Sequence, residues 1–123
     1  MKEGDLTSSI IGICIEVHKT LGPGLLESIY ERAICLELGW AGIRYLRQEG
    51  VEVSYKGVPL DLGFRPDFII ENKVILELKS CEHVLPVHKK ILLTYLKLTE
   101  LEVGLLINFR EAKLIDGITR LVN

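Results

Sequence analysis

The hydrophobic positions at the start of the chain recur every three or four residues, as they do in an amphipathic helix. They are Leu6, Ile10, Ile13, Val17 and Leu21. We therefore predict a helix over residues 5–20, which Gly22-Pro23-Gly24 ends. The same spacing returns over residues 25–38, so the chain begins with two helices that meet at a tight corner. The second helix is apolar at Leu26, Ile29, Ala33 and Leu36.

The middle of the chain changes to the alternation that is typical of strands. Residues 45–55, 58–70 and 74–79 are the predicted strands. Helical spacing returns over residues 86–99, where we expect Leu92, Leu93 and Leu96 to face inward. Residues 103–108 form a short apolar strand, and the last residues can add another. The order α-α-β-β-β-α-β predicts an α/β fold with a mixed central β-sheet flanked by helices.

Two of the predicted strands form a hairpin whose register follows from its apolar positions. With Glu71-Asn72-Lys73 as the loop, Phe68 pairs with Leu76 and Ile70 with Val74. One face of the hairpin is then apolar throughout, as a buried face requires. A shift by one residue would place charged side chains against apolar ones, so this register is favoured.

The same register places Asp67 opposite Glu77 on the other face. Facing β-carbons lie about 4.5–5.5 Å apart, where like charges repel. A divalent cation such as Mg²⁺ or Mn²⁺ would relieve this repulsion, because it prefers hard oxygen ligands. A raised pKa of one carboxyl group is the alternative. Lys79, on the face of Glu77, can reach a metal-bound water or the charge that develops on a phosphate.

Composition limits the number of domains, the way a nucleic acid could bind and the cellular location. The chain has 123 residues, 48% hydrophobic and 26% charged, which is enough for one packed domain over residues 1–123. A net charge of −2 offers no broad positive surface, so a nucleic acid would have to be gripped locally. The three cysteines are widely spaced and suggest free thiols in a reducing compartment. Neither a signal-peptide core nor a membrane-length apolar run is present, so we expect a cytoplasmic protein without a membrane partner.

Two motifs resemble a known family. Pro66-Asp67 followed by Glu77-Leu78-Lys79 matches the P-D…(D/E)-x-K signature of the restriction-endonuclease-like nuclease superfamily. Gly24-Leu25-Leu26-Glu27-Ser28-Ile29-Tyr30 matches the G-x-x-E-x-x-Y signature of a family of small prokaryotic proteins within it. Flanking stretches at residues 17–24, 86–88 and 103–109 resemble the same family, so the similarity covers nearly the whole chain.

The resemblance implies a restriction-endonuclease-like core and hydrolysis of phosphodiester bonds in DNA or RNA, with Mg²⁺ or Mn²⁺ as cofactor. Glu27 would join Asp67 and Glu77 as catalytic and metal-binding carboxylates, and Lys79 would be the catalytic lysine. Without the resemblance, the better interpretation of Glu27 is a first-turn carboxylate that the helix dipole favours. Small domains of this superfamily often cut duplexes as dimers, which allows a homodimer, although the sequence pattern identifies no dimer surface.

The accessory site candidates are His18, Tyr30 and Tyr95. For His18, packing between helices is at least as good an interpretation.

The chain departs from the family at one position. Members usually carry Gln four residues before the tyrosine of the helix that follows the E-x-K strand, where this chain has Ile91 ahead of Tyr95. In related nucleases this Gln orients the substrate or the metal-bound water. A nucleic-acid-binding or assembly module that keeps the fold without turnover is therefore the alternative function, and hydrolysis of a small phosphate ester is a third. Cys81, His83 and His88 match no common zinc spacing.

Overall fold

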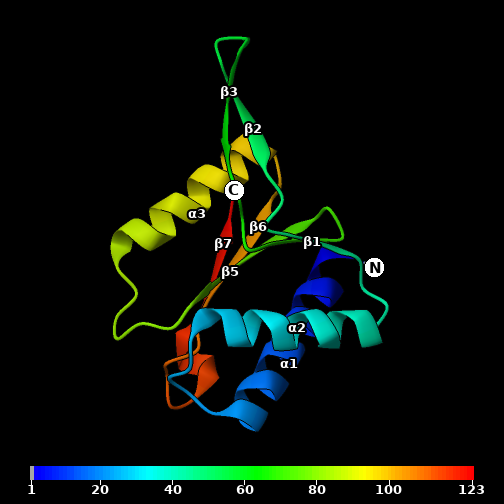
Figure 1. Ribbon diagram of the computed structural model, residues 1–123, viewed down its shortest axis with the longest axis vertical. Helices are drawn as coiled ribbons and strands as arrows, with labels where there is room; N and C mark the ends of the chain where they lie inside the picture. The colour runs from blue at the N-terminus through cyan, green and yellow to red at the C-terminus, as the bar shows by residue number, and fades with distance from the viewer. Residues whose placement is uncertain (1) are drawn as a thin grey trace.

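The computed structural model describes residues 2–123 as a β-sheet with helices on both faces (Figure 1). Helices α1 (Glu3–Leu21) and α2 (Glu27–Trp40) lie on one face, and α3 (Pro86–Thr99) lies on the other. Met1 of the expected domain lies outside the described residues. Of the helices described, none combines the length and apolar character needed to span a bilayer.

The central sheet has the strand order β1-β4-β5-β6-β7. Strands β5 and β6 pair in parallel, and the other neighbours pair antiparallel. This mixed sheet with flanking helices confirms the predicted α/β class and the restriction-endonuclease-like core. The strands are β1 (Tyr45–Arg47), β4 (Phe68–Ile70), β5 (Val74–Lys79), β6 (Val103–Asn108) and β7 (Ile118–Val122), and a short 3₁₀ helix, η1 (Leu114–Gly117), precedes the last of them.

The region between residues 45 and 70 forms more strands than the sequence predicts. Gln48 has a φ of 53° and turns the chain between β1 and β2 (Val51–Tyr55). Pro66 lacks the N–H that a strand interior needs, and it separates β3 (Val58–Phe64) from β4. Each of the two long predicted strands is therefore divided in two. Strands β2 and β3 pair with each other and extend away from the central sheet (Figure 1).

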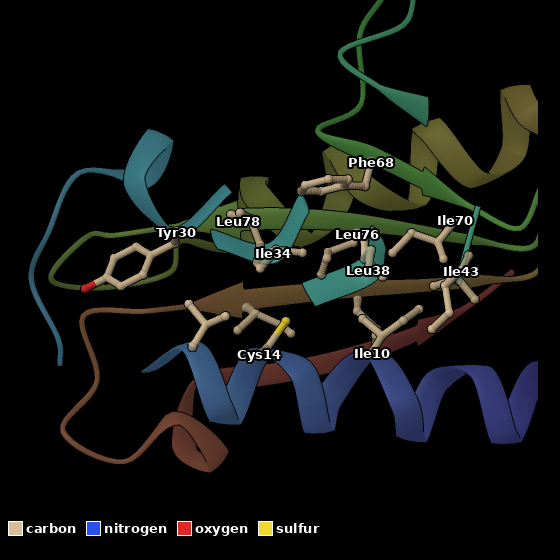
Figure 2. Packing of buried hydrophobic residues seen from close by; sticks show 14 of the residues in the cluster. Ile10, Cys14, Tyr30, Ile34, Leu38, Ile43, Phe68, Ile70, Leu76 and Leu78 are labelled. Carbon is tan, nitrogen blue, oxygen red and sulfur yellow. The ribbon is translucent and has the colours of Figure 1, made fainter. Parts of the chain in front are cut away.

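The central sheet separates two hydrophobic clusters. The larger cluster packs against α1 and α2 and includes Leu76 and Leu78 of β5 (Figure 2). The smaller cluster packs against α3 and includes Ile75 of the same strand. Because side chains alternate along a strand, Glu77 and Lys79 lie on the α3 face of the sheet.

Helix α2 does not bury the apolar stripe that the sequence suggests. Its buried hydrophobic side chains are Tyr30, Ile34 and Leu38. Leu26, Ile29 and Leu36 of the predicted stripe are exposed instead. Periodicity finds both apolar faces of this helix, but only the position of the sheet decides which one enters the core.

The other predicted elements agree closely with the structure. Helix α3 and strands β5 and β6 have the predicted bounds. Leu92 and Leu96 are buried as expected, but the prediction that Leu93 faces inward is wrong, since it is exposed. The three cysteines are free, and burial raises the pKa of the Cys14 thiol, so this thiol is inert.

Candidate active site

The β4–β5 hairpin has the register that its apolar positions predict. Phe68 pairs with Leu76 and Ile70 with Val74. The backbone ladder ends at Phe68, and the side chain of Asp67 continues the contact beyond it. The Leu78 N–H donates to Asp67 Oδ2 at 2.8 Å.

Asp67 and Glu77 meet where this ladder ends. The Asp67 N–H donates to Glu77 Oε1 at 3.0 Å, so two acids ten residues apart in sequence come together. The backbone of one residue thereby holds the carboxylate of the other. The predicted proximity of these two acids is therefore present in the fold.

Hydrogen bonds engage both carboxylate oxygens and both backbone polar groups of Asp67. Its Oδ1 accepts from Gln48 Nε2 at 3.0 Å, and its backbone carbonyl accepts from the Gln48 N–H at 3.1 Å. The bonds to Leu78 and Glu77 complete the set. Four hydrogen bonds thus fix the position of Asp67 and the orientation of its carboxylate.

Gln48 also connects Asp67 to an ion pair in which Glu31 is buried and Arg47 is exposed. Gln48 Nε2 lies 3.4 Å from Glu31 Oε1, and the same oxygen accepts from Arg47 Nε at 2.6 Å. Glu31 is buried in α2, and its carboxylate raises the pKa of the Arg47 guanidinium. The left-handed backbone of Gln48 aims its amide at both acids.

Sequence reasoning misses Glu31, Arg47 and Gln48. One signal was available, because Glu31 follows Glu27 by four residues and lies one helical turn below it. Glu31 is connected to Asp67 through Gln48 because α2 packs beside the end of β1. The sequence alone does not reveal this packing. These three residues enlarge the site from a hairpin motif to a network that crosses three elements.

Glu77 carries an unusual proton affinity. Burial raises its pKa to about 8, the charge of Asp67 adds to this rise, and Lys79 opposes it. In the absence of a cation, Glu77 therefore holds a proton at neutral pH. The structure thus realises the alternative of a raised pKa that the facing carboxylates predict.

A cavity of about 120 Å³ lies between β5 and α3 beside this pair. Its lining side chains are Glu77, Lys79, His88, Ile91, Leu92, Tyr95 and Leu106. The ring of Tyr95 stacks on Phe64 at 4.3 Å between centroids. Burial, followed by the charges of Glu77 and Asp67, raises the pKa of Tyr95, so its hydroxyl stays protonated as a hydrogen-bond donor.

Tyr30 holds the corner between α1 and α2. Its hydroxyl donates to the Gly22 carbonyl at 2.6 Å and accepts from the Leu25 N–H at 3.0 Å. Its ring stacks on that of Phe109, with 4.4 Å between the centroids. Tyr30 lies at one end of the larger cluster (Figure 2). The Ser80 hydroxyl donates to the Leu25 carbonyl at 2.6 Å, which ties the start of α2 to the end of β5. The tyrosine of the motif therefore positions the helix.

Two other predicted site residues, Glu27 and His18, lie apart from the contact between Asp67 and Glu77. Glu27 is exposed as the first residue of α2. Among the residues that the structure describes, no three His, Cys, Asp or Glu side chains form a group that could hold a metal ion. The structure therefore brings together Asp67, Glu77 and Lys79, and Glu27 does not join the two acids. His18 is buried, with Nε2 2.8 Å from the Glu111 carbonyl, which supports the interpretation that it packs between elements.

The donor set of the site fits a divalent cation. Asp67 and Glu77 offer carboxylate oxygens, the ligands that Mg²⁺ and Mn²⁺ prefer. The raised pKa of Glu77 means that burial and the charge of Asp67 leave this pair short of positive charge. A cation between the two acids would supply that charge.

The comparisons with known proteins identify the family of the chain. A model of the PD-(D/E)XK nuclease superfamily matches residues 4–121. Searches of curated proteins and of solved structures found no significant match. The match covers both halves of the acidic pair, Lys79 and the helices around them, and the chain belongs to the PD-(D/E)XK nuclease superfamily.

Proposed function

We propose that the protein is a metal-dependent nuclease that hydrolyses phosphodiester bonds in DNA or RNA, with Mg²⁺ or Mn²⁺ as its cofactor. The contact between Asp67 and Glu77, beside a cavity that Lys79 lines, carries the proposal. Membership of a nuclease superfamily supports the reaction class. When bound at the two carboxylates, a divalent cation would polarise the phosphate and lower the pKa of a bound water.

Each side chain of the site has a distinct task in this proposal. Asp67 supplies a ligand whose orientation is fixed by hydrogen bonds. Glu77 supplies a second ligand after it loses its proton, so metal affinity should rise with pH. Lys79 stabilises the negative charge that develops on the phosphate. Glu27, at the start of α2, acts through water or a second ion.

Tyr95 is the accessory residue with the clearest chemical task. It shares the cavity with Glu77 and Lys79, and its hydroxyl keeps its proton. It can therefore donate a hydrogen bond to a phosphate oxygen that enters the cavity. The stacking of its ring on Phe64 fixes the direction of this donor.

Cleavage assays test the proposal. Single- and double-stranded DNA and RNA are incubated with the protein and Mn²⁺ or Mg²⁺. Lys79→Ala should lower the cleavage rate by about 10²-fold or more. Lys56→Ala, an exposed lysine on the β2–β3 hairpin, should leave the rate unchanged. The proposal fails if no substrate is cleaved faster by the natural sequence than by Lys79→Ala.

One observation favours the second candidate, a nucleic-acid-binding or assembly module without turnover. The apolar side chain of Ile91 lines the cavity where related proteins usually have Gln. Ile91 is 43% exposed, so Ile91→Gln should leave the packing intact. Nucleic-acid binding that is unaffected by chelators, with no cleavage by either protein, would favour the module. Cleavage that Ile91→Gln accelerates would favour the nuclease.

A further inference from the structure

Helix α2 has a second apolar face in addition to the one it buries. Ile29, Leu36 and Trp40 are 42%, 57% and 74% exposed, and the spacing places half-buried Ala33 on the same side of the helix. Leu26, the extended residue just before the helix, is 72% exposed beside them in sequence. A helix on the surface of a globular protein normally has one apolar stripe, which faces the core. Helix α2 already fills that role with Tyr30, Ile34 and Leu38.

The spacing of the exposed face is regular. Ile29, Ala33, Leu36 and Trp40 follow one another by four, three and four residues. These are the a and d positions of a heptad repeat, the pattern of a helix that packs along another helix. We call these four residues the heptad face.

The surface beside the heptad face is hollowed on both sides. A hollow of about 190 Å³ lies between α1 and α2 and is lined by Leu21, Ala33, Leu36 and Trp40, among others. A second, of about 620 Å³, has Leu21, Ile29, Ala33 and Leu36 in its lining. Ala33 and Leu36 line both hollows, so the side chains of a helix that packs along this face can enter them.

The flanking charges select the partner and its direction. With Ala33 at position a, Arg32 occupies the preceding g position and Glu37 the following e position. In a parallel pair of identical helices, g of one helix meets e of the next heptad in the other, so Arg32 meets Glu37 twice. An antiparallel pair would instead oppose Arg32 to Arg32 and Glu37 to Glu37. The helix is thus complementary to a parallel copy of itself.

We propose that the heptad face binds a second copy of this chain, with the two α2 helices parallel about a two-fold axis. The proposal does not depend on the nuclease activity. It has a consequence for that activity, because the Ser80–Leu25 hydrogen bond ties the start of α2 to the end of β5. A parallel pair therefore sets both candidate active sites at the same height along the axis, near the start of each α2.

Sedimentation velocity at tens of micromolar protein tests the dimer. The natural sequence should sediment as a dimer, and Leu36→Glu should weaken association at least a hundredfold. Leu62→Glu is the matched control, because Leu62 is 75% exposed on the β2–β3 hairpin, and it should remain dimeric. Circular dichroism confirms folding of each variant. A monomeric natural protein, or dissociation by Leu62→Glu and not by Leu36→Glu, overturns the proposal.

Reversing the charges of Arg32 and Glu37 tests whether the two helices are parallel, and it leaves Leu36 and the apolar face unchanged. Arg32→Glu and Glu37→Arg should each weaken the dimer by about two- to tenfold, because each creates two like-charge contacts. The double variant Arg32→Glu/Glu37→Arg should return the affinity to that of the natural sequence. Single variants without effect, or a double variant as weak as the singles, contradict the arrangement.

Discussion

Glu77 is the residue on which the chemistry depends most. It lies between the sheet and α3, where burial disfavours its charge, and it faces Asp67, which disfavours the charge further. Lys79 compensates only in part. In the proposed nuclease, a carboxyl group in this position would hold its proton until a cation binds, which would couple metal binding to proton release.

The proton on Glu77 predicts how stability depends on pH. The pKa of Glu77 rises from an ordinary value of 4.5 to about 8 in the folded protein. Between these values the folded state binds more protons than the unfolded chain, so the free energy of unfolding should fall as pH rises from about 5 to about 8. The fall is at most about 1.4 kcal/mol per pH unit. Denaturant titrations of metal-free protein should show a shallower fall for Glu77→Gln, and equal slopes would refute this.

Gln48 is predicted to matter for the metal through Asp67. Gln48→Gly removes the amide that holds Asp67 Oδ1, while glycine accepts the φ of 53° without strain. We expect Mn²⁺ affinity, measured by calorimetry, to fall about 10-fold or more, as for other residues that orient a metal ligand. Lys56→Gly is the matched control, because Lys56 has a φ of 49° on the exposed β2–β3 hairpin. Equal affinities of both variants would exclude the positioning role.

At the scale of elements, local patterns predict whatever depends on one strand or one helix. The bounds of β5 and α3 follow from alternation and from Pro86, and the β4–β5 register follows from the need for one apolar face. That register in turn predicts the contact between Asp67 and Glu77. The sequence of this one hairpin therefore predicts the positions of Asp67, Glu77 and Lys79.

The rest of the site depends on contacts between elements. Gln48 reaches Asp67 because the chain turns at a left-handed residue, and no sequence rule requires Gln to take that conformation. Glu31 reaches Gln48 because α2 buries one of its two apolar faces, and periodicity cannot say which. Choosing the wrong face of α2 hides Glu31 and directs attention to the exposed Glu27.

The corner between α1 and α2 is predicted to depend on the Tyr30 hydroxyl. Tyr30→Phe removes hydrogen bonds to Gly22 and Leu25 and leaves a half-buried carbonyl and N–H without this partner. The free energy of unfolding should fall by about 1–3 kcal/mol. Tyr55→Phe, on the exposed end of β2, should leave it unchanged in the same denaturant titration. No difference between the two variants would mean that the ring alone holds the corner.

At the scale of the whole molecule, charge and shape restrict how a substrate is held. A net charge of −2 gives no general attraction to nucleic acid. In the proposed nuclease, binding would therefore be concentrated where a cation and Lys79 meet the phosphate. The cation would also offset the negative charge of Asp67, which would otherwise repel the phosphate.

Titration of the metal-free protein with Mn²⁺ in a calorimeter tests the central claim most directly. At pH 8 the natural sequence should bind Mn²⁺, while Asp67→Asn and Glu77→Gln should each bind it at least tenfold more weakly. Asp61→Asn, on the exposed β2–β3 hairpin, should bind it normally. Binding should also release more protons at pH 7 than at pH 9, because Glu77 is protonated at the lower pH. Equal Mn²⁺ affinity in all four proteins would contradict a metal site at Asp67 and Glu77.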